Sequence, residues 1–242
     1  IHGWCFPFLI AYRSWCVLFC TGAMAIGKMY IIWMHGLGDE GRSWRSLMDE
    51  IKIPTLTQPI TWKFPDAPTA PVTCNEGYEM RSWFDIEDIP VTVDAKDYPE
   101  DIQASVARIH GLIAEAEREG FDSREVFLGG FSQGGALAIQ AALRYPKPVG
   151  GAVCFSGWVM LRASLPSLIQ PANAKTPIFW GHGSRDGVVV YAQQAVGVAA
   201  LREAGVPVVD YTCRGAQHSS TAAEVEQAAQ FLANIAAGRP PQ

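Results

Sequence analysis

One serine lies between glycines in the segment Gly130-Phe131-Ser132-Gln133-Gly134, where a short apolar run meets an alanine-rich segment of helical pattern. The pattern G-x-S-x-G at such a junction is typical of a nucleophilic serine held on a sharp turn. Glycines two residues before and after the serine are required because side chains there would collide with the neighbouring strand and helix. The same pattern also fits an ordinary glycine-rich helix start, so the motif alone does not decide.

A serine nucleophile needs a base, and the base needs a carboxylate that orients it. Asp186 follows the apolar run 177–183, and His218 follows the apolar run 208–213. The order serine, aspartate, histidine is the one in which a parallel α/β sheet carries such a triad. Asp210 is a second candidate carboxylate, but it lies inside a strand pattern, where a local partner role fits better. The spacing therefore predicts Ser132, Asp186 and His218 as the catalytic residues.

The other histidines fit the role of base less well. His2 lies near the start of the chain, and His110 lies within a helical pattern. His182 precedes Asp186 and would reverse the order of the triad. His35 is expected to pack beneath the loop that follows the first predicted strand.

That loop, MHGLGD at residues 34–39, matches the HG-type loop that supplies a backbone N–H to an oxyanion hole. We expect Leu37 or its neighbour to give one donor and Gln133, the residue after the serine, to give the other. Gly36 and Gly38 would allow the required backbone geometry. Losing one donor of this kind costs about 10²–10³ in kcat.

These residues must be positioned by regular elements, and the sequence predicts them. Apolar runs of strand length occupy residues 30–36, 126–132, 151–157, 177–183 and 208–213. Helical patterns lie between them at about 99–119, 133–145, 188–204 and 219–237. Continuous hydrophobicity favours parallel strands buried on both faces, and strand-helix alternation favours an α/β fold with right-handed crossovers. Residues 54–98 are rich in Pro, Asp and Thr and are predicted to be mostly a functional loop.

The composition limits the classes of function. The chain has 242 residues, of which 49% are hydrophobic and 18% charged, so it is long enough for one large domain with a sizeable core. The formal net charge of −5 and the absence of a basic stripe argue against nucleic acid as a partner. The six cysteines form no CxxC pair and no metal-ligand spacing. We expect them to be reduced and mostly buried.

Residues 1–28 stand apart from the remaining chain. They are strongly apolar and carry only Arg13 and Lys28 as charges. Three interpretations are open: a secretory signal, a membrane anchor, or an upstream artefact before a true start at Met24 or Met29. The run between the two charges is shorter than the roughly 20 residues that span a membrane. We favour the artefact, and therefore expect one domain over residues 29–242 and a cytoplasmic location, with secretion or anchoring if the leader is real.

Several segments together resemble one family. HGLGDEG, the 64–86 segment FPDAPTAPVTCNEGYEMRSWFDI, GGFSQGG, FSGW, GHGSRDGVV and GAQHS occur in consistent order over about residues 30–237. The sequence is similar to the acyl-protein thioesterase and carboxylesterase group of α/β-hydrolases, sometimes grouped with the lysophospholipases. The resemblance implies the α/β-hydrolase fold, in which helices flank a mostly parallel central sheet. It also implies the same triad and the oxyanion donors Leu37 and Gln133.

The resemblance carries expectations about substrate contacts as well. Trp158 matches a family position near an acyl-binding groove, and Trp83 and Phe84 match the WFD that closes the 64–86 loop. Together with Val188 they are predicted to bind substrate, although ordinary core packing is the alternative for each. Two residues in the loop that carries Asp186 depart from the family pattern. The first is Ser184, which stands where the family often has an acidic residue.

The second departure is Val190, which stands where the family often has proline. Neither position belongs to the triad, so activity is expected to survive both changes. The substrates implied are long-chain acyl thioesters on protein cysteines, small carboxylic esters and lysophospholipids. The partner would be an acylated protein or a small acyl ester, with transient contact at a membrane surface. A Ser-Asp-His mechanism through an acyl-enzyme needs no metal and no organic cofactor.

Three functions remain open from the sequence. The first is a serine thioesterase that removes acyl groups from proteins. The second is a small-molecule carboxylesterase or lysophospholipase with the same triad, which differs only in substrate profile. The third is a hydrolase-fold binding protein without catalysis, against which the intact serine, aspartate, histidine and glycine set argues.

Overall fold

The central element of the molecule is a parallel β-sheet. The computed structural model describes residues 25–240, and residues 1–24 of the predicted leader lie outside that range. The sheet contains β2 (Thr61–Lys63), β1 (Tyr30–Met34), β5 (Val126–Phe131), β6 (Gly151–Phe155), β7 (Ile178–Gly183) and β8 (Val208–Cys213), in that order. All neighbouring strands in it pair in parallel. The predicted fold class, a mostly parallel sheet flanked by helices, is confirmed.

The strands read as continuous apolar runs because both faces of the sheet are buried. In β1, Tyr30, Ile32 and Met34 belong to one hydrophobic core, whereas Ile31 and Trp33 belong to another on the opposite face. Successive side chains of a strand point to opposite faces, so a strand covered on both sides needs apolar residues at every position.

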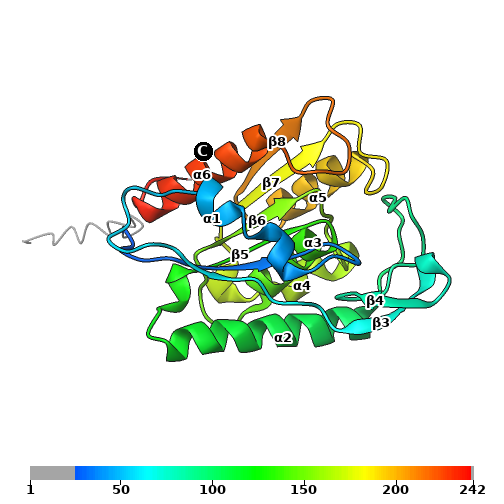
Figure 1. Cartoon of the computed structure of the whole chain (residues 1–242), viewed down its shortest axis with the longest axis horizontal. Coiled ribbons are helices and arrows are strands. Elements are labelled where there is room, and N and C mark those ends of the chain that lie inside the picture. Colours follow the sequence, from blue (N-terminus) through cyan, green and yellow to red (C-terminus); the bar gives the residue numbers. More distant parts are fainter. Residues whose placement is uncertain (1–24, 241–242) are drawn as a thin grey trace, which may run out of the picture.

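Helices cover both faces (Figure 1). α2 (Pro99–Arg118), α3 (Gln133–Arg144), α4 (Leu165–Leu168) and α5 (Ala192–Glu203) supply the first core, and α1 (Leu47–Glu50) and α6 (Ala222–Ala236) supply the second. Short 3-10 helices span Gly41–Trp44, Thr73–Asn75, Ser123–Glu125, Arg162–Ser164 and Pro171–Asn173.

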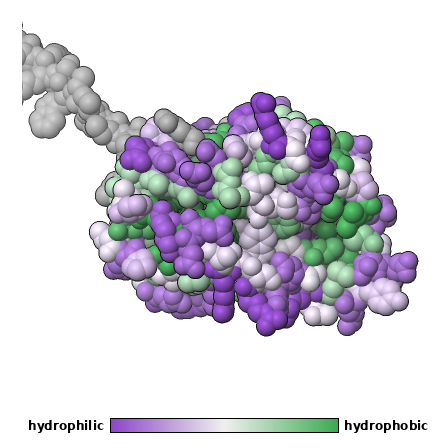
Figure 2. Space-filling view, turned by 45° about the horizontal axis from the view of Figure 1, so that its top comes forward, coloured by the Kyte–Doolittle hydropathy of each residue, from purple (hydrophilic) through white to green (hydrophobic). Residues whose placement is uncertain are grey.

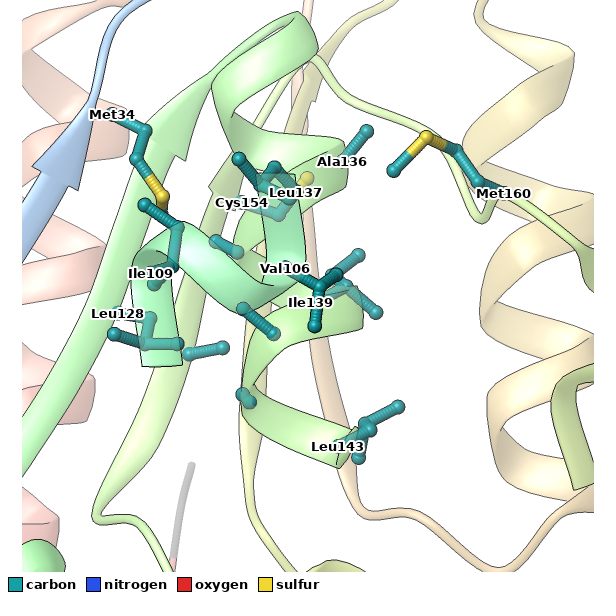
Figure 3. Close-up of a cluster of buried hydrophobic side chains, with 14 of the residues drawn as sticks. Met34, Val106, Ile109, Leu128, Ala136, Leu137, Ile139, Leu143, Cys154 and Met160 are labelled. Atoms are coloured by element: carbon teal, nitrogen blue, oxygen red, sulfur yellow. The ribbon is translucent and has the colours of Figure 1, made fainter. Parts of the chain in front are cut away.

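The first core fixes the helix that follows Ser132. α2 presents Val106 and Ile109 to α3, which carries Leu137 and Ile139 (Figure 3). Every residue of α3 from Gln133 to Leu143 is buried. A helix enclosed on all sides cannot shift without opening the core, so its N-terminus is a rigid platform.

The segment predicted as mostly loop contains more regular structure than expected. It includes the edge strand β2 and a hairpin of β3 (Thr69–Val72) and β4 (Tyr78–Arg81), which lies at one end of the molecule (Figure 1). β2 has only three residues and takes its pairing from β1. The hairpin is mostly exposed, and Pro71 interrupts its pattern, so neither element has the apolar periodicity that marks a strand.

The helix predicted from residue 188 begins at Ala192 instead. Val189 forms a parallel β-bridge with Val91, with Val91 N donating to Val188 O at 2.7 Å and Val190 N donating to Val91 O at 3.2 Å. Extended backbone is incompatible with a helix, so residues 184–191 form a loop that is attached to the 82–98 segment.

Hydrophilic residues surround smaller hydrophobic areas on the face shown in Figure 2. The exposed large hydrophobic residues within the described range are Met48, Tyr78 and Ile89. No helix among residues 25–240 is both long enough and apolar enough to cross a membrane. The described cysteines are free thiols; Cys154 and Cys213 are buried and Cys74 is partly exposed.

α6, the helix after His218, begins with a buried acid. Thr221 and Glu224 form a capping box, in which Thr221 Oγ1 accepts from Glu224 N at 3.1 Å. Glu224 is fully buried, and its Oε1 has no hydrogen-bond partner in the described part of the chain. Burial raises the pKa of this carboxyl from 4.5 to about 7. The folded state therefore favours the protonated acid.

This burial predicts a pH dependence of stability. The pKa of Glu224 is higher in the folded protein than in the unfolded chain. Protonated Glu224 therefore contributes fully to the stability of the fold below about pH 4.5, and this contribution is lost as the pH rises through about 7. Glu224→Gln should remove this dependence. The free energy of unfolding of the variant minus that of wild type should therefore increase by on the order of 3 kcal/mol between pH 4.5 and pH 8. Denaturant unfolding at several pH values measures it, with Glu226→Gln on the exposed face of α6 as the control. Parallel curves for wild type and Glu224→Gln would contradict it.

Candidate active site

Ser132 occupies a strained turn between β5 and α3. Its backbone angles are φ 56° and ψ −120°, a conformation that costs a non-glycine residue about 1–3 kcal/mol. The turn is tight because α3 approaches the sheet closely. A Cβ on Gly134 would lie 2.2 Å from Met34 O, and one on Gly130 would lie 2.4 Å from the backbone of Gly134. The predicted steric need for glycine at both positions is therefore visible in the contacts.

The structure brings the three predicted side chains together. His218 Nε2 lies 2.9 Å from Ser132 Oγ, and His218 Nδ1 lies 2.7 Å from Asp186 Oδ2. The serine follows β5, the aspartate follows β7 and the histidine follows β8, so all three stand at the carboxyl ends of strands. An ionised carboxylate only accepts hydrogen bonds, so Nδ1 carries the proton and Nε2 is free to accept the serine hydroxyl proton.

Asp186 is held as a buried anion. Burial by itself would raise the pKa of this carboxyl, but donors from His182, His218 and the backbone N–H of Val188 hold the pKa well below its usual range. Asp186 Oδ1 accepts the backbone N–H groups of Val188 and Val189, each at 2.9 Å. The negative charge that would stabilise a protonated His218 is therefore fixed in place.

Two backbone N–H groups are available beside the serine. No hydrogen bond among the described residues uses the N–H of Leu37 or of Gln133. The loop of Leu37 approaches the serine so closely that a Cβ on Gly36 would lie 3.4 Å from Ser132 Cβ. Gln133 is the first residue of α3, where the helix dipole favours negative charge. Both predicted oxyanion donors therefore have a backbone N–H that no described hydrogen bond occupies, and whether they stabilise an oxyanion stays a prediction.

The Gln133 side chain has a separate structural role that the sequence motif did not reveal. Its Oε1 accepts Trp83 N at 3.0 Å, and its Nε2 donates to Phe84 O at 2.6 Å and to Ser82 Oγ at 3.0 Å. Trp83 Nε1 donates in turn to His35 O at 2.9 Å. The 82–84 segment therefore ties the serine turn to the oxyanion loop.

His35 packs beneath that loop as expected. It is fully buried, its Nδ1 lies 2.7 Å from Gly36 O, and its Nε2 accepts Ala67 N at 3.0 Å. Burial lowers the pKa of His35, which keeps the imidazole neutral. The loop is held from below by a neutral ring, and no charge is introduced next to the oxyanion donors.

A cavity of about 230 Å³ opens at the serine. Its lining is mostly apolar and consists of Gly36, Leu37, Asp39, Trp44, Ile86, Ile89, Val91, Phe131, Ser132, Trp158, Val188, Val189 and His218. Two of the predicted substrate-binding residues, Trp158 and Val188, are in this lining. The other two, Trp83 and Phe84, are not.

Trp83 is 2% exposed and committed to the hydrogen bonds described above. Phe84 lines a second cavity of about 180 Å³ and packs edge to face against Trp158 at 5.8 Å. For Trp83 and Phe84, the structure therefore favours the packing alternative over direct contact with substrate at Ser132. Trp158, Ile86 and Val91 line both cavities and form the wall between them.

The two departures from the family pattern are accommodated in the Asp186 loop. Ser184 Oγ accepts Gly215 N at 2.9 Å, which links this loop to the one that carries His218. Val190 belongs to the extended segment beside Val91. With both residues present, Asp186 still lies within hydrogen-bond distance of His218. Among residues 25–240, no cluster of His, Cys, Asp and Glu side chains is arranged to hold a metal ion.

Comparisons with known proteins show the family and the fold of the chain. A family model described as phospholipase/carboxylesterase matches residues 26–236. Carboxylesterase SOBER1 of Arabidopsis thaliana is 36% identical over 83% of this chain and 88% of the relative. Its crystal structure has a TM-score of 0.82, covering 86% of this chain and 99% of that chain.

Two further relatives carry different functional names. Acyl-protein thioesterase 1 of Gibberella zeae is 31% identical over 84% of this chain and 88% of the relative. A protein of Oryza sativa named probable inactive carboxylesterase Os04g0669700 is 38% identical over 73% of this chain and 72% of the relative. Similarity alone therefore does not separate active from inactive members, and the geometry at Ser132 becomes the discriminating evidence.

The aspartate yields a direct test of this geometry. Asp186→Asn preserves the shape of the side chain but removes its charge and favours the wrong His218 tautomer, so kcat for an acyl ester should fall by about 10³–10⁴. Asp210→Asn is the matched control, because Asp210 pairs with Arg202 at 2.6 Å on the surface. Steady-state kinetics on both variants measures the effect. Equal activity in the two would exclude Asp186 from the mechanism.

Proposed function

The chain belongs to the phospholipase/carboxylesterase family, and from this premise we propose that it is a serine hydrolase of acyl esters and thioesters with Ser132 as its nucleophile. The observation that carries the proposal is the continuous path Ser132 Oγ–His218–Asp186, with distances of 2.9 and 2.7 Å. A binding protein that had lost catalysis would have no need for a buried anion aligned behind a histidine and a strained serine.

The mechanism follows from the protonation states. His218 Nε2 accepts the hydroxyl proton as Ser132 Oγ attacks the acyl carbonyl, and the Asp186 carboxylate stabilises the imidazolium that forms. The tetrahedral oxyanion is stabilised by the N–H groups of Leu37 and Gln133. His218 then protonates the leaving thiol or alcohol. Water activated by the same imidazole hydrolyses the acyl-enzyme and regenerates Ser132.

The lining of the cavity supports an acyl group as the part of the substrate that enters the site. Leu37, Ile86, Val188 and Trp158 offer apolar surface and no cation that would bind a polar headgroup. The substrate we favour is an acyl thioester on a protein cysteine, in line with the relative named acyl-protein thioesterase 1. Thioesters suit the site because a thiol is a good leaving group and needs little help from the enzyme beyond a proton.

A specific observation favours a second candidate, a carboxylesterase for short acyl esters. The cavity at Ser132, about 230 Å³, falls below the 300–1,000 Å³ of typical ligand pockets. The wall formed by Trp158, Ile86 and Val91 separates it from the second cavity. A short acyl chain would fit this cavity as the structure stands, whereas a longer one would reach the second cavity only if this wall moved.

The nucleophile is tested with a fluorophosphonate probe, which phosphonylates activated serines. Wild type should be labelled and should hydrolyse acyl thioesters, whereas Ser132→Ala should do neither, with a loss of about 10⁶ in kcat. Ser156→Ala is the control, since this buried serine follows β6 and has no base beside it. Labelling that persists in Ser132→Ala, or a folded wild type that resists labelling, would overturn the proposal.

The acyl chain length is tested at Trp158. Trp158→Ala should join the two cavities and raise the ratio of kcat/KM for long-chain over short-chain substrates by about tenfold or more, because each methylene accommodated in an apolar site contributes roughly 1–3 kcal/mol. Trp158→Leu should shift the ratio in the same direction at a smaller cost in stability. Matched thioesters of increasing length give the measurement. An unchanged ratio in both variants would mean that acyl chains do not pass this wall.

A further inference from the structure

Asp186 has two imidazoles as partners. His182 Nε2 lies 3.4 Å from Asp186 Oδ2, the same oxygen that His218 Nδ1 contacts at 2.7 Å. The side chains of His182 and Asp186 are both fully buried. Sequence order alone excluded His182 as the base, and nothing in the proposed mechanism makes use of it.

The hydrogen bonds of His182 fix its tautomer. Trp180 Nε1, which can only donate, lies 3.4 Å from His182 Nδ1. His182 Nε2 lies 2.9 Å from Val189 O, which can only accept. The proton is therefore on Nε2, where it faces both Val189 O and the Asp186 carboxylate. His182 therefore acts as a hydrogen-bond donor through Nε2, and no hydrogen bond joins it to His218.

His182 also closes a ring around the loop that carries the aspartate. The imidazole contacts the carbonyl of Val189, and the N–H of Val189 donates to Asp186 Oδ1 at 2.9 Å. His182 itself belongs to β7, a strand that pairs with β6 on one side and β8 on the other. Through these contacts a residue of strand β7 holds the orientation of the Asp186 carboxylate, although Asp186 itself lies in a loop.

Other titratable groups lie around His182. The Tyr191 ring lies 6.0 Å from the imidazole, and its hydroxyl is 2.8 Å from Thr212 on β8. Cys213 is the next residue on β8, and burial raises the pKa of its thiol to about 11, so it stays protonated. From α6, buried Glu224 lies against Gly181, the residue before His182.

We propose that His182 is a positioning residue of the triad, whose Nε2–H orients the Asp186 carboxylate and shares its charge with His218. This inference rests on the proposed function, since it assigns a role within the same site. Removing the donor should have two effects. The carboxylate would lose alignment, which lowers kcat, and its full charge would fall on His218, which favours the imidazolium.

The second effect, a more stable His218 imidazolium, shifts the pH dependence of kcat/KM in one direction. A packing defect would not produce this shift. A base that is harder to deprotonate needs a higher pH to act, so the acid limb of kcat/KM should move to higher pH. In His182→Leu we expect kcat to fall about ten- to hundredfold, the range of a hydrogen bond to a charged group. We expect the acid limb to rise by on the order of half a pH unit.

The test compares variants matched in polarity. His182→Gln can place an amide N–H near the position of Nε2, whereas the shorter His182→Asn cannot reach the carboxylate. His182→Gln should retain the acid limb of wild type and most of its kcat. His182→Asn should show the same loss of kcat and the same shift of the acid limb as His182→Leu. This pair keeps the test valid if His182→Leu does not fold. His110→Gln is the control, because His110 also contacts a backbone carbonyl, at 2.9 Å, but lies away from the triad.

Three outcomes overturn the inference: a wild-type profile in His182→Leu, equal rates in the Gln and Asn variants, or a uniform loss with no shift of the acid limb. Each of these leaves the proposed function intact, because wild type would still be labelled at Ser132 and would still turn over acyl esters. Failure of the proposed function would instead show in wild type itself, as absence of labelling.

Discussion

The close approach of α3 to β1 is the constraint on which the remaining site depends. At Gly134 the helix backbone comes so near to Met34 O that a single methyl group would not fit. The approach forces Ser132 into its strained turn, places the N–H of Gln133 at the helix N-terminus and brings the Gly36–Leu37 loop over the serine. The burial of α3 on all sides resists this strain, so the fold rather than the loop itself holds the nucleophile.

A second set of contacts, between β7 and β8, positions His218 and Asp186. β7 and β8 pair over six residues and end beside each other, which places the Asp186 and His218 loops in contact. Backbone N–H groups and His182 complete the hydrogen bonding of a carboxylate that would otherwise be costly to bury. The bridge between Val189 and Val91 connects this loop to the segment that lines the cavity at Ser132.

The sequence predicted those parts of the fold and of the site whose local residue pattern matches their place in the structure. The apolar runs, the glycines around Ser132 and the order of Asp186 and His218 sufficed to predict the parallel sheet and the residues that the structure brings together. β2 and the β3–β4 hairpin escaped prediction because their pairing comes from partners or from a turn, not from apolar periodicity. The place of Trp83 depends on hydrogen bonds between segments distant in the chain, to His35 and to Gln133, for which a single sequence holds no signal.

The crystal structure of the enzyme after reaction with a long-chain alkyl fluorophosphonate would test the central claim most directly. We predict a covalent bond to Ser132 Oγ, with the phosphonyl oxygen about 2.7–3.1 Å from the N atoms of Leu37 and Gln133. The alkyl chain should lie along Leu37, Val188 and Trp158. An adduct on another residue, or a phosphonyl oxygen turned away from both N–H groups, would contradict the account.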